Sequence, residues 1–130
     1  MNYALRIDLE RPFDEALAMI KESLAESGFG ILTEINLKAT LKNKIDVDIE
    51  DQIILGACNP RFAYRGLQVE PSLGLLLPCN VVVRHQAGVT VVETIDPETM
   101  VTLTGNPQME AVADEVRQAL KAALDRVASA

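Results

Sequence analysis

The chain has 130 residues, of which 48% are apolar and 24% are charged, and it contains two cysteines and one histidine. This length supports one hydrophobic core, so we expect a single domain over residues 1–130. Nineteen acidic and twelve basic side chains give a formal charge of -7, which disfavours nucleic-acid binding, and no apolar run approaches the ~20 residues that span a membrane.

Four elements are predicted in the first third of the chain. Residues 3–9 alternate apolar and polar side chains, which is the pattern of a half-buried strand. A helix follows from Pro12 to Gly28, because apolar side chains recur every three or four residues and the glycine supplies a C-terminal cap. Residues 29–37 alternate again and predict a second strand. Residues 38–44 predict about two turns of helix with the lysines outward.

The rest of the chain predicts three strands and two helices. Residues 53–58 are almost uniformly apolar, which indicates a strand covered on both faces. Asn59 and Pro60 are typical of an N-cap and a first helical turn, so a helix is expected from there to about residue 70. Residues 79–86 and 89–95 predict a valine-rich hairpin. A last helix carries an apolar stripe made of Val112, Val116, Leu120, Leu124 and Val127.

This order of elements favours an α+β fold with two layers, in which helices cover one face of a mostly antiparallel sheet. The hairpin supplies valines to both faces, with Val81, Val83, Val89 and Val91 on one and Val82 and Val92 on the other. Helices on one side leave the second face uncovered, and soluble monomers avoid apolar patches of that kind. We therefore expect a homodimer with the sheet surface or its edge in the interface.

The two cysteines are the most distinctive chemical feature. Cys58 ends one predicted strand and Cys79 begins another, and an asparagine follows each of them, Asn59 and Asn80. If these strands are antiparallel neighbours, both thiols lie at the same end of the sheet. Cys58 also precedes a helix N-terminus, whose partial positive charge favours a thiolate and lowers the pKa.

The cysteine count also bears on the compartment. Two cysteines in a chain of this size do not form the disulfide framework of a secreted domain, and the first residues lack the pattern of a signal peptide. We expect a cytoplasmic protein whose cysteines stay as thiols.

The hairpin turn decides where Glu93 lies. A three-residue loop over residues 86–88 places Val81 opposite Glu93. The same loop places Cys79 opposite Ile95, so Glu93 joins the Cys79 face. A two-residue loop instead moves Glu93 to the other face, where it is only a surface charge.

Metal binding at the cysteines needs further ligands. His85 lies six residues from Cys79 along one strand, about 20 Å at ~3.3 Å per residue, so only another chain could bring an imidazole there. Two thiolates leave a tetrahedral metal two ligands short. A metal held by Cys58 and Cys79 would therefore require Glu93, water or a second subunit.

Three functions follow from this pattern. The first is a non-catalytic module that binds or senses a small ligand or soft metal at a sheet end formed by the candidate residues Cys58, Asn59, Cys79, Asn80 and Glu93. The second is a thiol-dependent redox enzyme, with Cys58 as the attacking thiolate and Cys79 as the resolving thiol. The third is a structural dimerisation module, in which both cysteines are core residues. No cofactor or specific ligand is indicated.

The sequence also resembles a known family. Residues 54–60 (ILGACNP) and residues 74–83 (GLLLPCNVVV) are similar to the bacterial and archaeal family called domain of unknown function 302, and the similarity extends over roughly residues 1–128. The resemblance implies a compact α+β domain with a sheet like that of one TATA-box-binding-protein repeat, and a homodimer. It implies no nucleic-acid binding and no established activity. Cys58 and Cys79 correspond to the signature cysteines of this family.

Overall fold

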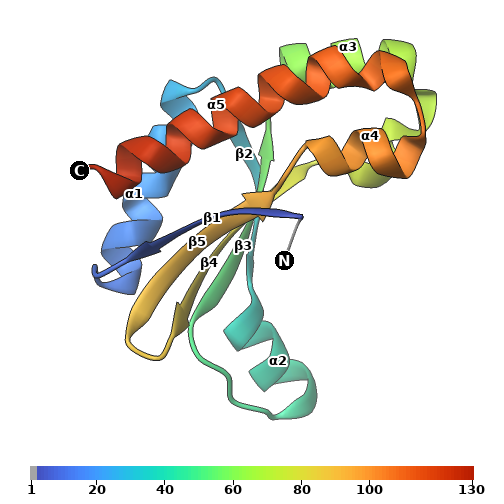
Figure 1. Ribbon diagram of the computed structural model, residues 1–130. Coiled ribbons are helices and arrows are strands. Elements are labelled where there is room, and N and C mark those ends of the chain that lie inside the picture. Colours follow the sequence, from blue (N-terminus) through green and yellow to red (C-terminus); the bar gives the residue numbers. More distant parts are fainter. Residues whose placement is uncertain (1–2) are drawn as a thin grey trace.

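The computed structural model describes residues 3–130 and contains one five-stranded sheet with helices packed against it (Figure 1). Its strands lie in the order β1-β5-β4-β3-β2, and every neighbouring pair is antiparallel. The elements in chain order are β1 (Ala4–Leu9), α1 (Phe13–Glu26), β2 (Gly30–Asn36), α2 (Leu37–Ile45), β3 (Gln52–Cys58), α3 (Pro60–Val69), η1 (Pro71–Leu76), β4 (Cys79–Gln86), β5 (Val89–Ile95), α4 (Glu98–Thr104), η2 (Pro107–Met109) and α5 (Glu110–Ala128). The predicted α+β class is confirmed.

Local sequence signals explain several element ends. Helix α1 ends at Glu26, and Gly28, two residues later, has a φ of 85°. The backbone N–H of Phe29 donates to the carbonyl of Leu24 at 2.9 Å. This is the left-handed glycine cap that the sequence predicts. Asn106 caps the short helix η2, because its side chain accepts a hydrogen bond from the N–H of Gln108 at 3.0 Å.

The main core lies between the sheet and the helices. Helix α5 packs on α1, α3, α4 and β1, and Figure 1 shows it running along one side of the sheet, with α2 at the opposite end of β3. Leu55, Val81, Val83 and Val92 bury their side chains in this core. The predicted stripe of α5 is confirmed, since all five of its members are buried: Val112, Val116, Leu120, Leu124 and Val127.

The β4–β5 hairpin does not have the three-residue loop described in the sequence analysis. Gln86 pairs with Val89, so the loop contains only Ala87 and Gly88, whose φ values are 50° and 82°. Two consecutive residues with positive φ match the primed turn whose twist suits a hairpin, and here that preference outweighs the strain on a non-glycine residue. Val82 therefore faces Glu93 across the strands, which is the two-residue alternative.

This register also corrects the distribution of valines. Val92 pairs with Val83 and so shares the helix-covered face, whereas Val91 pairs with Arg84 and lies on the other face. Val91 is nonetheless buried, and Val82 is half-buried. The uncovered face therefore carries Val82, Val89 and Val91 instead of the predicted Val82 and Val92.

Helix α4 is absent from the sequence-based prediction. Asp96 lies two residues before its first residue, and the carboxylate of Asp96 accepts a hydrogen bond from the N–H of Glu98 at 3.0 Å. Helix α4 has only seven residues before the left-handed Gly105, so it is too short to show an apolar period. Among residues 3–130, no helix combines the length and apolar character needed to cross a membrane.

Candidate functional site

The antiparallel pairing of β3 and β4 brings the two cysteines to one end of the sheet. Ala57 pairs directly with Cys79, so Cys58 is the next residue along β3. Both cysteines are free thiols, and both line the same crevice. Cys79 is buried and Cys58 is half-buried, so the crevice has one shielded thiol and one that reaches toward solvent.

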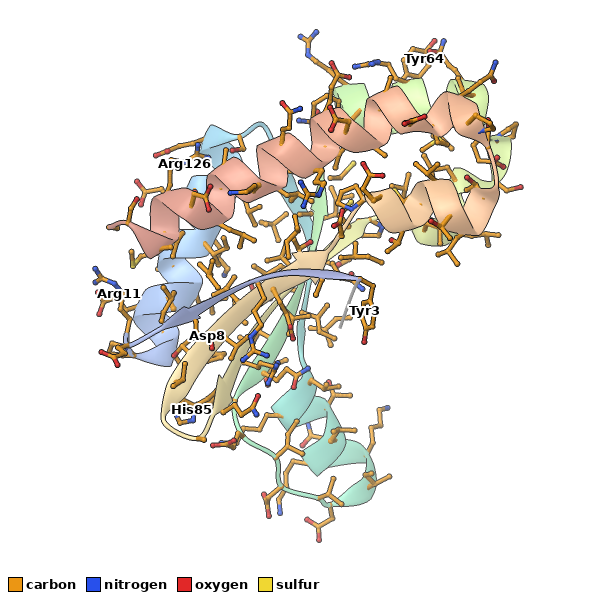
Figure 2. The ribbon with its side chains drawn as sticks, in the orientation of Figure 1. Tyr3, Asp8, Arg11, Tyr64, His85 and Arg126 are labelled. Carbon is orange, nitrogen blue, oxygen red and sulfur yellow. The ribbon has the colours of Figure 1, made fainter. Side chains whose placement is uncertain are left out.

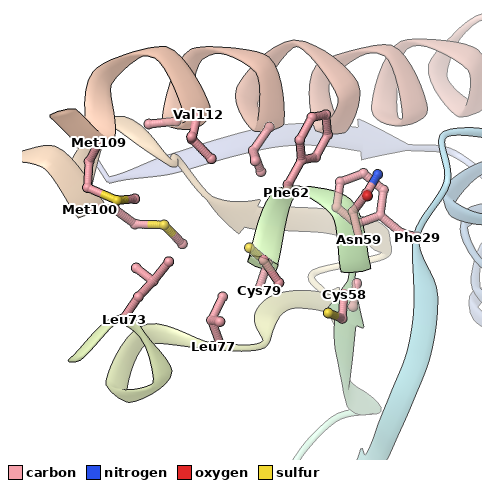
Figure 3. A pocket seen from close by; sticks show the side chains of 14 residues that line it. Phe29, Cys58, Asn59, Phe62, Leu73, Leu77, Cys79, Met100, Met109 and Val112 are labelled. Carbon is pink, nitrogen blue, oxygen red and sulfur yellow. The ribbon is translucent and has the colours of Figure 1, made fainter. Parts of the chain in front are cut away.

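The crevice is narrow and mostly apolar (Figure 3). Its volume is about 30 Å³, and its walls include the side chains of Phe29, Phe62, Leu73, Leu77 and Val112. A single water occupies roughly 10–15 Å³ by this measure, whereas sites for drug-sized molecules extend over ~300 Å³ or more. The crevice therefore suits an ion or a ligand of a few atoms.

Burial has a chemical consequence for Cys79. Removal from water raises the pKa of this thiol from 9.0 to about 11, and the neighbouring Cys58 shifts it in the same direction. Desolvation acts this way because it penalises the charged thiolate. At neutral pH Cys79 is therefore a protonated thiol, which is a weak nucleophile and not a ready resolving thiolate.

Asn59 takes the predicted position but not the predicted hydrogen bond. It is the N-cap residue of α3, yet its side chain accepts no hydrogen bond from the helix. Its amide nitrogen instead donates to the carbonyl of Ser27 at 3.5 Å. Asn59 therefore bridges the start of α3 and the end of α1 beside the crevice. Pro60 has no backbone N–H, so the first turn of α3 has one fewer unpaired donor.

Asn80 and Glu93 lie apart from the crevice. Glu93 accepts a hydrogen bond from Arg84 at 2.8 Å on the sheet face opposite the core. Together with Tyr3 and Asn80 it lines a separate, open hollow of about 250 Å³. The interpretation that Glu93 serves the cysteine site is therefore wrong. The two-residue hairpin loop, which the sequence analysis gave as the alternative, places Glu93 on the face away from Cys79.

Histidine and carboxylate ligands are missing from the crevice. His85 lies near the β4–β5 turn, where its ring nitrogen is 3.1 Å from a carboxylate oxygen of Glu50 (Figure 2). Within residues 3–130, no group of three or more His, Cys, Asp or Glu side chains is arranged to hold a metal. A zinc-type site built from those residue types has no support in this part of the chain.

Two methionines complete the sulfur content of the crevice. Met100 of α4 and Met109 of η2 line it together with Cys58 and Cys79, and Figure 3 shows their side chains extending toward the cysteine end of the sheet. Sequence reasoning missed them as site residues. Met100 follows Asp96-Pro97, and Met109 follows Asn106-Pro107. Such a pair predicts where a helix begins, but it does not predict which part of the fold the helix packs against.

The chain is similar to proteins without an assigned activity. A family model described as "Domain of unknown function DUF302" matches residues 5–127. A crystal structure of an uncharacterized conserved protein DUF302 from Bacillus stearothermophilus is 28% identical, with a TM-score of 0.91 over 97% of this chain and 98% of that chain. No curated protein matches the chain.

Proposed function

Because the chain belongs to the family of domain of unknown function DUF302, which carries no assigned activity, we propose a function from the crevice itself: a non-catalytic module that binds a small thiophilic ligand through Cys58 and Cys79. The observation that carries this proposal is that two free thiols from different strands line one narrow apolar crevice. Sulfur donors select soft ligands over hard ones.

Binding fits this site better than thiol redox catalysis does. A resolving cysteine attacks as a thiolate, whereas burial raises the pKa of Cys79 to about 11. A binding site can replace the thiol proton with a metal ion, and the proton then leaves to solvent. The proposal includes a reducing compartment such as the cytoplasm, where both thiols stay available.

Titration with soft ions tests this function. Reduced protein is titrated without oxygen with silver(I) and, separately, with cadmium(II), while thiolate-to-metal absorption and the thermal midpoint are followed. We expect saturation at one ion per chain and a raised midpoint, because a ligand that binds only the folded state stabilises it. Cys58→Ser and Cys79→Ala are each expected to weaken binding at least tenfold, and His85→Ala, which removes a side chain outside the crevice, is expected to leave it unchanged.

Two outcomes would overturn the proposal. One is a lack of saturable binding of either ion to the folded wild-type chain. The other is independent binding at two equivalents, with each cysteine variant losing only its own ion. Cys58 is half-buried, so the Cys58→Ser variant keeps the test valid even if Cys79→Ala unfolds the chain.

We also propose that the module acts as a homodimer, with an apolar strip formed by Tyr3, Val82, Ile95, Leu75 and Leu103 in the interface. Leu75 and Leu103 are 87% and 66% exposed, and they line a hollow that shares Ile95 with the hollow beside Tyr3. Exposed apolar surface of this kind is typical of protein contacts.

The charges beside the strip favour a second copy of the chain as its partner. On the uncovered sheet face, Arg84 pairs with Glu93 and Arg6 pairs with Asp8, at 2.8 Å and 2.7 Å. Because these charges are already paired, two such faces can meet without adding like-charge repulsion, although each chain has a net charge of -7.

A further inference from the structure

A larger hollow on the surface shares part of its wall with the thiol crevice. This outer hollow has a volume of about 350 Å³, and its lining includes Pro78 and Asn80, the residues on either side of Cys79 in the chain. The side chains of Leu77 and Met100 line both the outer hollow and the crevice. These two side chains therefore form part of the wall between the surface and the buried thiol.

The outer hollow is the larger and more accessible of the two cavities. Cys79 is only 6% exposed, and its crevice of about 30 Å³ is far smaller than the ~300 Å³ of a typical small-molecule site, whereas the outer hollow reaches that size. The exposed side chains of Leu75 and Leu103 border the outer hollow and make it apolar. A small uncharged molecule can therefore lie in the outer hollow without displacing the core.

The shared wall is built from short elements at the edge of the fold. Leu77 follows the six-residue η1, where a Cβ atom added to Gly74 would meet no atom within 4 Å. Met100 lies in the seven-residue α4, which Figure 1 shows beyond the end of the sheet. Short, loosely packed elements open at a lower free energy than central strands, and an unbranched methionine side chain adapts readily to such movement.

The opposite end of the crevice is held by longer elements. There Phe29 is buried, and Asn59 donates to the carbonyl of Ser27 at the end of α1. Opening this end would disturb the packing between α1, β3 and α3.

We infer that the outer hollow is the entrance to the thiol crevice and that Leu77 and Met100 form a gate through which small uncharged molecules reach Cys79. The inference rests on the proposed function for the role of Cys79, and it adds the route and the kind of molecule that the route admits. Uncharged molecules are favoured because a charge loses its hydration between apolar walls.

Labelling of Cys79 with methyl methanethiosulfonate, a small uncharged reagent, tests the gate. Cys58→Ser leaves Cys79 as the one thiol of the chain. The Cys79 thiolate forms a disulfide with the methylthio group of the reagent, methanesulfinate leaves, and the thiol proton passes to solvent, so the reagent is the oxidant. Mass spectrometry follows the adduct at nanomolar chain concentration, below the micromolar range in which a second copy would cover Leu75 and Leu103.

Shortening the gate side chains is expected to speed this reaction. In the Cys58→Ser background, Met100→Ala and Leu77→Ala are each expected to raise the labelling rate about tenfold or more, because the rate follows the population of the open state. Met109→Ala is the matched control, since Met109 is also buried and lines the crevice but does not line the outer hollow. Repeating the measurement in low urea separates opening of the gate from global unfolding, whose contribution rises steeply with urea.

Three results would overturn the gate: unchanged labelling in both gate variants, equal acceleration by Met109→Ala, or acceleration by Phe62→Ala, at the Cys58 end, that the gate variants lack. Leu77 is half-buried, so Leu77→Ala keeps the test valid even if Met100→Ala unfolds the chain. Faster labelling in the gate variants, together with a failed soft-ion titration, would instead overturn the proposed function and leave the gate intact.

Discussion

The reactivity of Cys79 is set by its burial rather than by its neighbours in sequence. It stands at a strand start beside a proline, positions that often face solvent, yet only 6% of it is exposed. Removal from water raises its pKa to about 11. A group of this kind makes the folded state bind more protons than the unfolded state over part of the alkaline range.

This shift predicts a loss of stability at alkaline pH. The unfolded thiol titrates near 9.0 and the folded one near 11, so the contribution of Cys79 is fully present below pH 9.0 and disappears as the pH rises toward 11. A shift of this size corresponds to about 2–3 kcal/mol. Urea unfolding of the wild type and of Cys79→Ala, followed across this range, is expected to give free energies that converge above pH 9.0. Curves that stay parallel would contradict the assignment.

Among the elements, β3 depends on a glycine to fit beside its neighbours. A Cβ atom on Gly56 would lie 2.2 Å from the hydroxyl oxygen of Thr33 in β2 and 2.8 Å from a ring carbon of Pro78. The register between β2 and β3 also shifts between Ile31 and Thr33. At Gly56, β3 therefore packs closely against both the irregular edge strand β2 and Pro78, the residue before Cys79.

Gly56→Ala is expected to destabilise the fold by about 1–3 kcal/mol, the usual cost of overpacking a closely packed position. Gly30→Ala is the matched control, because Gly30 also lies in a strand and its nearest neighbour, the carbonyl of Cys58, is 3.9 Å from the added carbon. Denaturant unfolding measures both. Equal losses for the two variants would show that strand propensity, rather than the contact with Thr33 and Pro78, explains the effect.

For the whole molecule, the apolar strip predicts self-association. We expect sedimentation equilibrium at micromolar concentration to give twice the chain mass of 14.2 kDa. Leu75→Glu and Leu103→Glu place charges at sites that are 87% and 66% exposed, so they are expected to shift the mass toward one chain without unfolding it. Leu32→Glu, at a 65% exposed site on β2, is the control and is expected to leave the dimer intact. A wild-type mass of one chain would refute the homodimer.

Features that depend on contacts between residues close in the chain were predictable from the amino-acid sequence. The alternating strand β1, the apolar stripe of α5 and the glycine cap at Gly28 depend on residues within a few positions of each other, and each is confirmed. The alternation predicted for residues 29–37 is not matched by burial, because β2 is exposed along nearly all of its length. The shared location of Cys58 and Cys79 also followed, because antiparallel pairing brings the end of one strand to the start of the next.

The remaining features of the site depend on contacts between elements that are distant in the chain. The hairpin register depended on whether Ala87 adopts a positive φ, a small local energy difference that moves Glu93 to the other face of the sheet. Met100 and Met109 reach the crevice through packing between α4, η2 and the sheet, contacts that no short sequence window contains. The pKa of Cys79 likewise depends on its burial, and burial is set by every element that packs around the thiol.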